Sequence, residues 1–172
     1  MTNPIADLAK ADVILMTGAN TTETHPVISI YIKRTVKSGR TKLIVIDPRY
    51  IPLSAHAVLK LTPRPGTDVA WINELMRVII EEKRFDKVFI DTRTEGFEQL
   101  ERSLEKYTPS FVESITGIAA DRLETTARLY ARAAAGNIVY CMGITQHSTG
   151  SVYIPVLYGR RRVVAAFFGL AK

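Results

Sequence analysis

Two uninterrupted apolar runs constrain the fold of this chain most strongly. Residues 13–16 (VILM) and residues 43–46 (LIVI) are apolar at every position, without the alternation of a strand that has one face in water. A strand of this kind is buried on both faces, which is typical of parallel sheets covered by helices. Between the runs, a polar loop precedes Pro26, which suits the first turn of a helix, and Gly39 ends that helix. The sequence therefore predicts a right-handed βαβ unit.

The rest of the chain continues this alternation. Residues 57–61 form a third predicted strand, residues 68–82 a helix and residues 138–140 a further buried strand. Shorter helical stretches lie between them, at residues 86–90, 96–106, 109–114 and 119–134. Thr108 is predicted to cap the third of these, and Gly136 with Asn137 to end the last. The predicted fold class is α/β, a Rossmann-like parallel sheet flanked by helices.

Helical spacing also predicts buried faces. In the helix that begins at Pro26, the expected inward residues are Val27, Ile30, Tyr31 and Val36. In the helix over residues 68–82, which either Thr67 or Asp68 caps, they are Trp71, Leu75, Val78 and Ile79.

Composition excludes several classes of protein. The single cysteine, Cys141, rules out an internal disulfide framework, an iron–sulfur cluster or a structural zinc held by this chain alone, and fits a reducing, cytoplasmic setting. No apolar run approaches the roughly 20 residues of a membrane helix, so no membrane insertion is expected. The net charge is +6, but the basic residues are not interleaved with aromatic ones, which argues against nucleic-acid binding.

Polar loops follow the predicted strands, where doubly wound sheets bind ligands. The first loop, residues 18–25 (GANTTETH), opens a helix whose free N–H groups would accept a phosphate, although its single glycine is equally consistent with an ordinary βα loop. In the second loop, Asp47 can accept the N1–H and amino group of guanine and Arg49 can bind a phosphate. The alternative for this pair is a surface salt bridge in a turn.

The third and fourth loops add further polar groups. Gly66 would let a ligand approach the backbone and Asp68 could hold a polar edge, while the alternative role of Asp68 is to stabilise the helix dipole. The fourth loop, residues 141–147, carries Met142, which is more often a core residue than a ligand. The three histidines lack metal-ligand spacing, and no hydrolase elbow is present. Cys141 acting as a nucleophile with His147 is less favoured than a buried cysteine at a strand end.

In combination these loops resemble one family. The segments 18–26 (GANTTETHP), 43–49 (LIVIDPR), 64–70 (RPGTDVA) and 142–146 (MGITQ) resemble the molybdopterin oxidoreductases in order and spacing. The intervening segments 78–82 (VIIEE), 93–97 (RTEGF), 107–109 (YTP) and 115–117 (ITG) are most similar to the catalytic alpha subunits of formate dehydrogenases. The resemblance covers residues 1–150, and it identifies the chain as an internal fragment of such a subunit.

The resemblance implies a cofactor and a set of binding residues. The family binds two molybdopterin guanine dinucleotides around molybdenum or tungsten, and residues 1–150 would form one of the α/β domains that hold them. The implied pyrophosphate and ribose contacts are Gly18, Asn20, Glu23, Thr24 and His25. The implied nucleoside contacts are Ile46, Asp47, Arg49, Gly66 and Asp68. The implied pterin contacts are Met142, Gly143 and Gln146.

The resemblance also implies what lies outside this chain. The family's cluster cysteines and metal ligand are absent, so we expect no catalytic residue and no metal ligand here, and a chain that is inactive alone. Its expected partners are the remaining domains of the same enzyme and electron-transferring iron–sulfur subunits, and the intact enzyme would oxidise formate to carbon dioxide. The alternative function is a stand-alone nucleotide-binding module without redox activity.

Residues 151–172 depart from the family pattern. They form a basic and apolar tail that reflects either a truncated or frame-shifted gene or a genuinely divergent end. Phe167 and Phe168 in this tail are expected to promote self-association.

Overall fold

A four-stranded parallel sheet forms the centre of the molecule, and the computed structural model describes it within residues 4–147. The strands are β1 (Val13–Thr17), β2 (Lys42–Ile46), β3 (Leu59–Leu61) and β4 (Gly136–Tyr140). Their order across the sheet is β3-β2-β1-β4, and every neighbouring pair is parallel. The predicted α/β class is therefore confirmed. The predicted tail, residues 151–172, lies outside the described residues.

Helices cover both faces of this sheet, which explains the uninterrupted apolar runs. Along β1, Val13 and Leu15 pack into the core on one face, whereas Ile14 and Met16 pack into the core on the other. All four of these side chains are buried. A strand with cores on both sides carries apolar side chains at successive positions, as Val13 to Met16 do, and in β1 only the last residue, Thr17, is polar.

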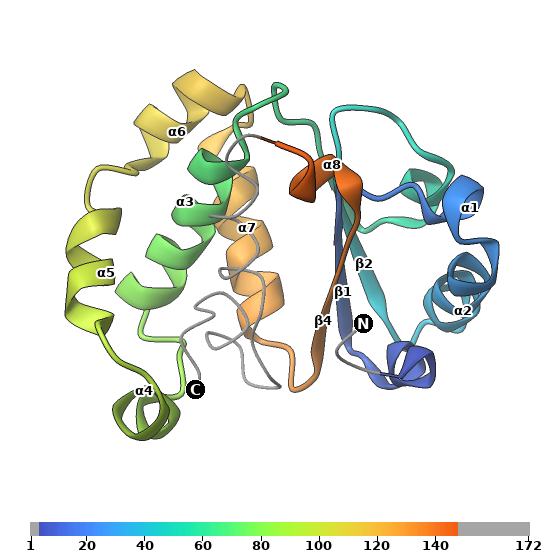
Figure 1. The fold of residues 1–172 in the computed structure, drawn as a ribbon, viewed down its shortest axis with the longest axis horizontal. Coiled ribbons are helices and arrows are strands. Elements are labelled where there is room, and N and C mark those ends of the chain that lie inside the picture. Colours follow the sequence, from blue (N-terminus) through green and yellow to red (C-terminus); the bar gives the residue numbers. More distant parts are fainter. Residues whose placement is uncertain (1–3, 148–172) are drawn as a thin grey trace.

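The larger core lies under the helical layer that connects β3 to β4. This layer consists of α3 (Asp68–Glu81), α4 (Lys87–Arg93), α5 (Phe97–Leu104), α6 (Pro109–Thr116) and α7 (Ala120–Ala131). Figure 1 shows α3 and α7 next to the sheet, with α5 and α6 outside them. Trp71 and Leu75 on α3 are fully buried, and Val78 and Ile79 are buried as well, so the predicted inward face of this helix is confirmed.

The opposite face carries η1 (Ile5–Lys10), α1 (Thr21–Thr24), α2 (Pro26–Lys37) and η2 (Pro52–His56). Here the predicted inward face of α2 is wrong at three of its four residues, whereas Val36 packs against the core. Val27, Ile30 and Tyr31 are 61%, 47% and 39% exposed, and Val36 is half-buried. The helix instead buries Ser29, Ile32 and Thr35.

Buried hydroxyl pairs explain this orientation of α2. Thr35 Oγ1 lies 2.7 Å from Thr41 Oγ1, and Thr41 in turn donates to the carbonyl oxygen of Ala11 at 2.6 Å. Ser29 Oγ lies 3.1 Å from Thr22 Oγ1. A hydrophobic pattern does not predict these partners, because it treats serine and threonine as surface residues.

Several predicted boundaries also change. The loops over residues 19–25 and 141–147 each contain a short helix, α1 and α8 (Met142–Thr145). Helix α7 ends at Ala131, and Gly136 begins β4 rather than ending the helix. A Cβ atom at Gly136 would lie 3.0 Å from the buried ring of Tyr130, so this glycine allows close strand–helix packing. Thr108 caps α6 through the amide of Phe111, as predicted.

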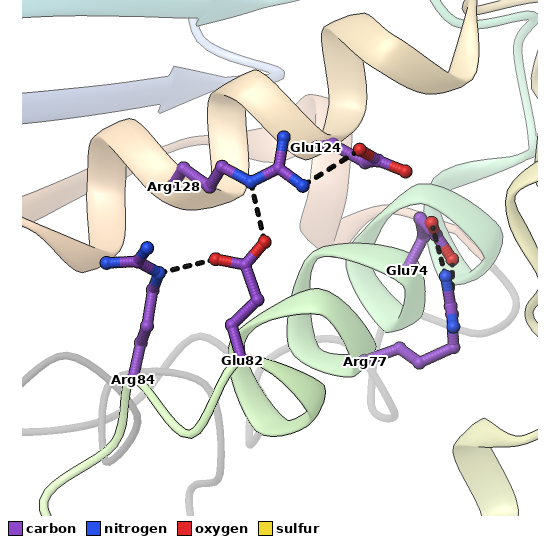
Figure 2. Close-up of polar contacts among 6 residues, drawn as sticks. All are labelled: Glu74, Arg77, Glu82, Arg84, Glu124 and Arg128. Carbon is purple, nitrogen blue, oxygen red and sulfur yellow. Dashed lines mark hydrogen bonds and ion pairs between the residues drawn. The ribbon is translucent and has the colours of Figure 1, made fainter.

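Charged side chains tie α3 to α7 at the edge of the helical layer (Figure 2). Arg128 Nε lies 2.6 Å from Glu82 Oε1, and its second nitrogen lies 3.0 Å from Glu124 Oε2. Glu82 also accepts a hydrogen bond from Arg84. These hydrogen bonds, first from Arg84 and then from Arg128, lower the pKa of Glu82.

Candidate functional site

The polar loops predicted from the sequence meet at one edge of the sheet. Because all four strands are parallel, their carboxyl ends lie together, followed by Gly18, Asp47, Thr62 and Cys141. The strand order reverses at β1, with β2 and β3 on one side and β4 on the other. Such a reversal opens a crevice between the loops that leave the two strands, and ligands of open α/β sheets bind there. Figure 1 shows α8 at this edge, next to β1.

Two glycines bring the loops after β1 and β4 into backbone contact. Gly143 donates its N–H to the carbonyl oxygen of Gly18 at 3.1 Å. A Cβ atom on Gly18 would lie 2.7 Å from the carbonyl carbon of Gly143, and one on Gly143 would lie 2.7 Å from the carbonyl oxygen of Gly18. Gly18 also has a φ of +54°, a conformation that favours glycine. The predicted site residues Gly18 and Gly143 are therefore adjacent, although 125 positions separate them.

Asp47 is a buried carboxylate held in a turn. Its side-chain Oδ1 accepts a hydrogen bond from the backbone N–H of Arg49 at 2.8 Å, which is an Asx turn of the Asp-Pro-Arg sequence. Arg49 Nε lies 3.5 Å from the same oxygen while most of its side chain is exposed. No partner for the second oxygen of Asp47 is recorded among residues 4–147. This oxygen is available as an acceptor.

Asp68 lies beside Asp47 at the start of α3. Its Oδ1 accepts a hydrogen bond from the indole N–H of Trp71 at 3.1 Å, and its Oδ2 lies 4.0 Å from His147 Nε2. Burial raises the pKa of Asp68, the Trp71 hydrogen bond and His147 oppose this rise, and the negative charge of Asp47 adds to it. The two carboxylates are thus close enough to interact electrostatically.

His147 links the fourth loop to this carboxylate. Its Nε2 lies 2.8 Å from the carbonyl oxygen of Gly143, and because a carbonyl can only accept, Nε2 carries the hydrogen. The sequence alone predicts no binding role for His147. The hydrogen bond between Asp68 and Trp71 is predictable from the sequence, because residues three apart on a helix lie on one face.

The loop before α3 is arranged differently from the prediction. Thr67 is the N-cap residue, but its hydroxyl donates to the carbonyl oxygen of Arg64 and neither Thr67 nor Asp68 caps an amide of the helix. Arg64 points to the end of α6, donating to the carbonyl oxygen of Ser114 at 2.7 Å. Gly66 has a φ of +81°, and no atom lies within 4 Å of its would-be Cβ. The space above Gly66 is therefore open, as a ligand would require.

Two buried polar atoms near Gly18 lack partners. Asn20 Oδ1 and Thr21 Oγ1 are buried and make no hydrogen bond with the described part of the chain. Buried polar atoms are almost always hydrogen-bonded, so these two oxygens, like Ser54 Oγ on η2, can each accept a further hydrogen bond. Thr21 was absent from the predicted site, and no feature of the local sequence distinguishes it from its neighbour Thr22.

The remaining predicted residues are dispersed around this centre. Glu23, Thr24 and His25 are exposed on or next to α1, where Thr24 Oγ1 donates to the carbonyl oxygen of Asn20 and lies 2.8 Å from His25 Nδ1. Met142 is 60% exposed at the start of α8, so it is not a core residue. Gln146 ends α8 and is exposed, and Ile46 is buried at the end of β2. The contacts of residues 4–147 do not join Glu23, His25 or Gln146 to Asp47 or Asp68.

Other features that bear on the function of the described part of the chain are its cysteine, any metal site, any membrane-spanning helix and any further cavity. Burial raises the pKa of the Cys141 thiol, which disfavours a nucleophilic thiolate. Within residues 4–147, no group of three or more histidine, cysteine or acidic side chains is placed to hold a metal ion, and no helix is long and apolar enough to cross a membrane. A cavity of about 450 Å³ between α4 and α5, lined by Phe85, Phe97 and Arg102, contains none of the predicted residues.

Comparison with known proteins shows that this chain is similar to one segment of much longer proteins. The chain is similar to the alpha subunit of F420-dependent formate dehydrogenase 1 from Methanococcus maripaludis, at 45% identity over 150 residues that cover 87% of this chain and 22% of that protein. Formate dehydrogenase H from Escherichia coli is 37% identical over 150 residues, covering 87% of this chain and 21% of that protein. The chain thus spans about a fifth of the length of these relatives, as expected for a fragment.

A solved structure and a family match agree with these similarities. The acetylene hydratase of Pelobacter acetylenicus superposes with a TM-score of 0.81 at 28% sequence identity, covering 92% of this chain and 21% of that one. The family described as molybdopterin oxidoreductase matches residues 1–156. The predicted resemblance is confirmed, and the chain belongs to the molybdopterin oxidoreductase family.

Proposed function

We propose that the carboxyl edge of this sheet holds the nucleotide end of a molybdopterin guanine dinucleotide, within a longer enzyme that oxidises formate to carbon dioxide. The observation that carries the proposal is the contact between Gly18 and Gly143, which brings two of the predicted loops together at the point where the strand order reverses. The two relatives named as formate dehydrogenases support the substrate.

The polar groups at this edge fit such a ligand. The available oxygen of Asp47 suits the N1–H and amino group of guanine, which both donate. Asn20 Oδ1 and Thr21 Oγ1 are buried atoms without partners that a ribose hydroxyl would satisfy. The open space above Gly66 lets a planar base approach the backbone next to Asp68.

The other predicted contacts extend this assignment. Glu23, Thr24 and His25 would line the pyrophosphate and ribose region, and Ile46 and Arg49 the nucleoside end. Met142, Gly143 and Gln146 would approach the pterin. When bound, the cofactor would supply molybdenum or tungsten as a two-electron acceptor for formate, while this chain's residues orient the nucleotide and exclude water from it.

Nucleotide binding by the 172-residue chain tests the pocket. We expect GDP to bind more tightly than ADP in a calorimetric titration, because Asp47 complements only the guanine edge. The variant Asp47→Asn keeps an oxygen for the Arg49 amide but exchanges the second acceptor for a donor. Its affinity for GDP should fall at least about tenfold, which corresponds to about 1.4 kcal/mol.

The matched control is Asp91→Asn, which removes one carboxylate from the exposed surface of α4 and should leave GDP binding unchanged. Equal affinities for GDP and ADP, full binding by Asp47→Asn, or no binding of millimolar GDP by the unaltered chain would each contradict the pocket assignment.

Formate oxidation needs the rest of a full-length enzyme. In a hybrid, residues 1–150 replace the matched segment of the Methanococcus maripaludis subunit. We expect this hybrid to reduce a redox dye with formate, and Asp47→Asn to lower both its pterin content and its activity. A fully loaded hybrid that does not oxidise formate would overturn the proposed substrate.

The alternative of a stand-alone nucleotide-binding module is not favoured, because the family match spans most of the chain. The proposed partners are the remaining domains of the enzyme and iron–sulfur subunits that receive its electrons. The division into a binding domain over residues 1–150 and a tail, and the cytoplasmic setting, stay predictions.

A further inference from the structure

The outward side of α2 is unusually apolar for a helix on the surface of a sheet. Ile30 and Tyr31 lie three and four residues after Val27, and Arg34 lies four and three residues after them. Lys37 follows Arg34 by three, so these five exposed residues form a single stripe along the helix. We call these five residues the α2 outer stripe. The stripe is apolar in its first half and cationic in its second half. The inward side of the same helix carries the smaller, partly polar residues Ser29, Ile32 and Thr35.

This exposure is built into the packing of the helix. A rotation of α2 that buried Ile30 and Tyr31 would pull Ile32 out of the core and break the Thr35–Thr41 and Ser29–Thr22 hydroxyl pairs. Buried hydroxyl groups that lose their partners destabilise a fold. The stripe is therefore held outward by the rest of the domain.

The charges at the second half of the stripe are also unmatched. No ion pair joins Arg34 or Lys37 to a carboxylate within residues 4–147. A surface that covers the stripe would therefore be apolar opposite Val27, Ile30 and Tyr31, and acidic opposite the two cations.

The comparisons indicate what such a surface could belong to. The relatives of this chain are several times longer, since the matched 150 residues are only 22% of the Methanococcus maripaludis subunit. Most of each relative is thus polypeptide outside the matched segment. Exposed apolar patches rimmed by charge mark sites of interaction, and domains of one chain bury them against each other.

We propose that the α2 outer stripe docks against another domain of the same full-length polypeptide, through an apolar surface flanked by acidic side chains. The proposal depends on family membership and not on the cofactor assignment, because the stripe is the exposed side of α2 and includes none of the proposed cofactor contacts. Figure 1 shows α2 apart from α8, which lies at the carboxyl edge of the sheet.

The test compares substitutions in the 172-residue chain and in the hybrid with the Methanococcus maripaludis subunit. Ile30→Glu and Tyr31→Glu place a carboxylate in the stripe, and Val88→Glu places one at a 73% exposed position on α4 as the matched control. All three should change the urea midpoint of the 172-residue chain only slightly, because each of these side chains is already at least 39% exposed. In the hybrid, the two stripe variants should increase the rate of limited proteolysis at least tenfold, whereas Val88→Glu should not change it.

Three results would overturn the proposal. One is a stripe variant that is as protease-resistant as Val88→Glu in the hybrid. Another is an unaltered hybrid that is cleaved as fast as its stripe variants. This chain is 45% identical to the segment of the Methanococcus maripaludis subunit that it replaces, so the unaltered hybrid should retain the docking contacts. The third is a dimer of the 172-residue chain that dissociates into monomers in the variant Ile30→Glu, since the stripe would then bind a second copy of the chain. Ile30→Glu should leave GDP binding by the 172-residue chain unchanged, because the stripe contains none of the proposed nucleotide contacts, so the two proposals can fail separately.

Discussion

The two faces of the sheet are packed in different ways. Under α3 and α7 lies a large apolar core that contains Trp71, and α3 buries the apolar side that its sequence predicts. Under α2 the core is smaller, buried hydroxyls such as Thr35 take part in it, and Ile30 and Tyr31 face outward. The first face follows the rule that apolar residues turn inward, and the second departs from it. The difference shows that apolar spacing is sufficient to orient α3, whereas buried hydroxyl pairs orient α2.

The largest expected effect lies in the helical core. Trp71→Ala removes a fully buried side chain and should lower the free energy of unfolding by about 3–5 kcal/mol. Trp71→Phe, which retains most of the ring volume, should cost less and allows a measurement if the alanine variant does not fold. Urea unfolding of the 172-residue chain measures both. A loss below about 1 kcal/mol for Trp71→Ala would contradict the view that this face holds the main core.

The contact between the loops of β1 and β4 should be the next most sensitive point. Gly18→Ala introduces a Cβ atom 2.7 Å from the Gly143 backbone at a φ of +54°, so crowding and strain together should cost about 2–4 kcal/mol. Gly39→Ala is the control, because its φ is +75° but no atom lies within 4 Å of the new Cβ. Its cost should be about 1 kcal/mol, from strain alone. Equal unfolding free energies for the two variants would show that the loops separate easily.

A smaller effect is expected from the hydroxyl pair beneath α2. Thr41 donates its hydrogen to the carbonyl oxygen of Ala11, so Thr35 must donate to Thr41. Thr35→Val deletes that donor while keeping the side-chain volume, and should lower the free energy of unfolding by about 1 kcal/mol. Thr35→Ser retains the donor and serves as the control. If valine were as stable as threonine, the hydroxyl pair would not explain why α2 holds its apolar residues outward.

The smallest expected effect is the pH dependence of stability that Asp68 causes. This residue begins α3, next to the candidate site. Burial raises the pKa of this carboxyl above 3.8 in the folded chain, so the folded state binds its proton more tightly than the unfolded state does. Asp68 therefore lowers stability as the pH rises from about 3.8 through its raised pKa. Asp68→Asn keeps an acceptor for the Trp71 indole and should remove this decline.

Urea midpoints between pH 3 and pH 7 test the sign of this effect. Asp68→Asn should gain stability relative to the unaltered chain as the pH rises over that interval. A gain that is largest at the acid end would mean that the charged form of Asp68 is stabilised in the folded chain, and it would contradict the assigned cause.

The sequence by itself determined the strands β1 to β4, the helices α2 to α7 and their order, but not the short helices η1, α1, η2 and α8. The apolar runs of β1 and β2 predict buried strands, and the spacing of Trp71, Leu75 and Ile79 predicts the inward face of α3, because both depend on neighbours within one strand or one helix turn. The loops that follow the strands also follow from local sequence. Knowing that the strands are parallel is then enough to bring Gly18, Asp47 and Asp68 to the same edge of the sheet.

Only the tertiary structure decided how those parts meet. The contact between Gly18 and Gly143 and the separation of Arg64 from the site depend on residues far apart in the sequence, which no local pattern specifies. The orientation of α2 was predicted wrongly because hydrophobic spacing describes which residues can be buried, not which neighbours receive them. Ile30 and Tyr31 lie on the exposed side of α2 because Thr35 and Ser29 pair with buried hydroxyl groups on its other side. These pairs join residues of different elements.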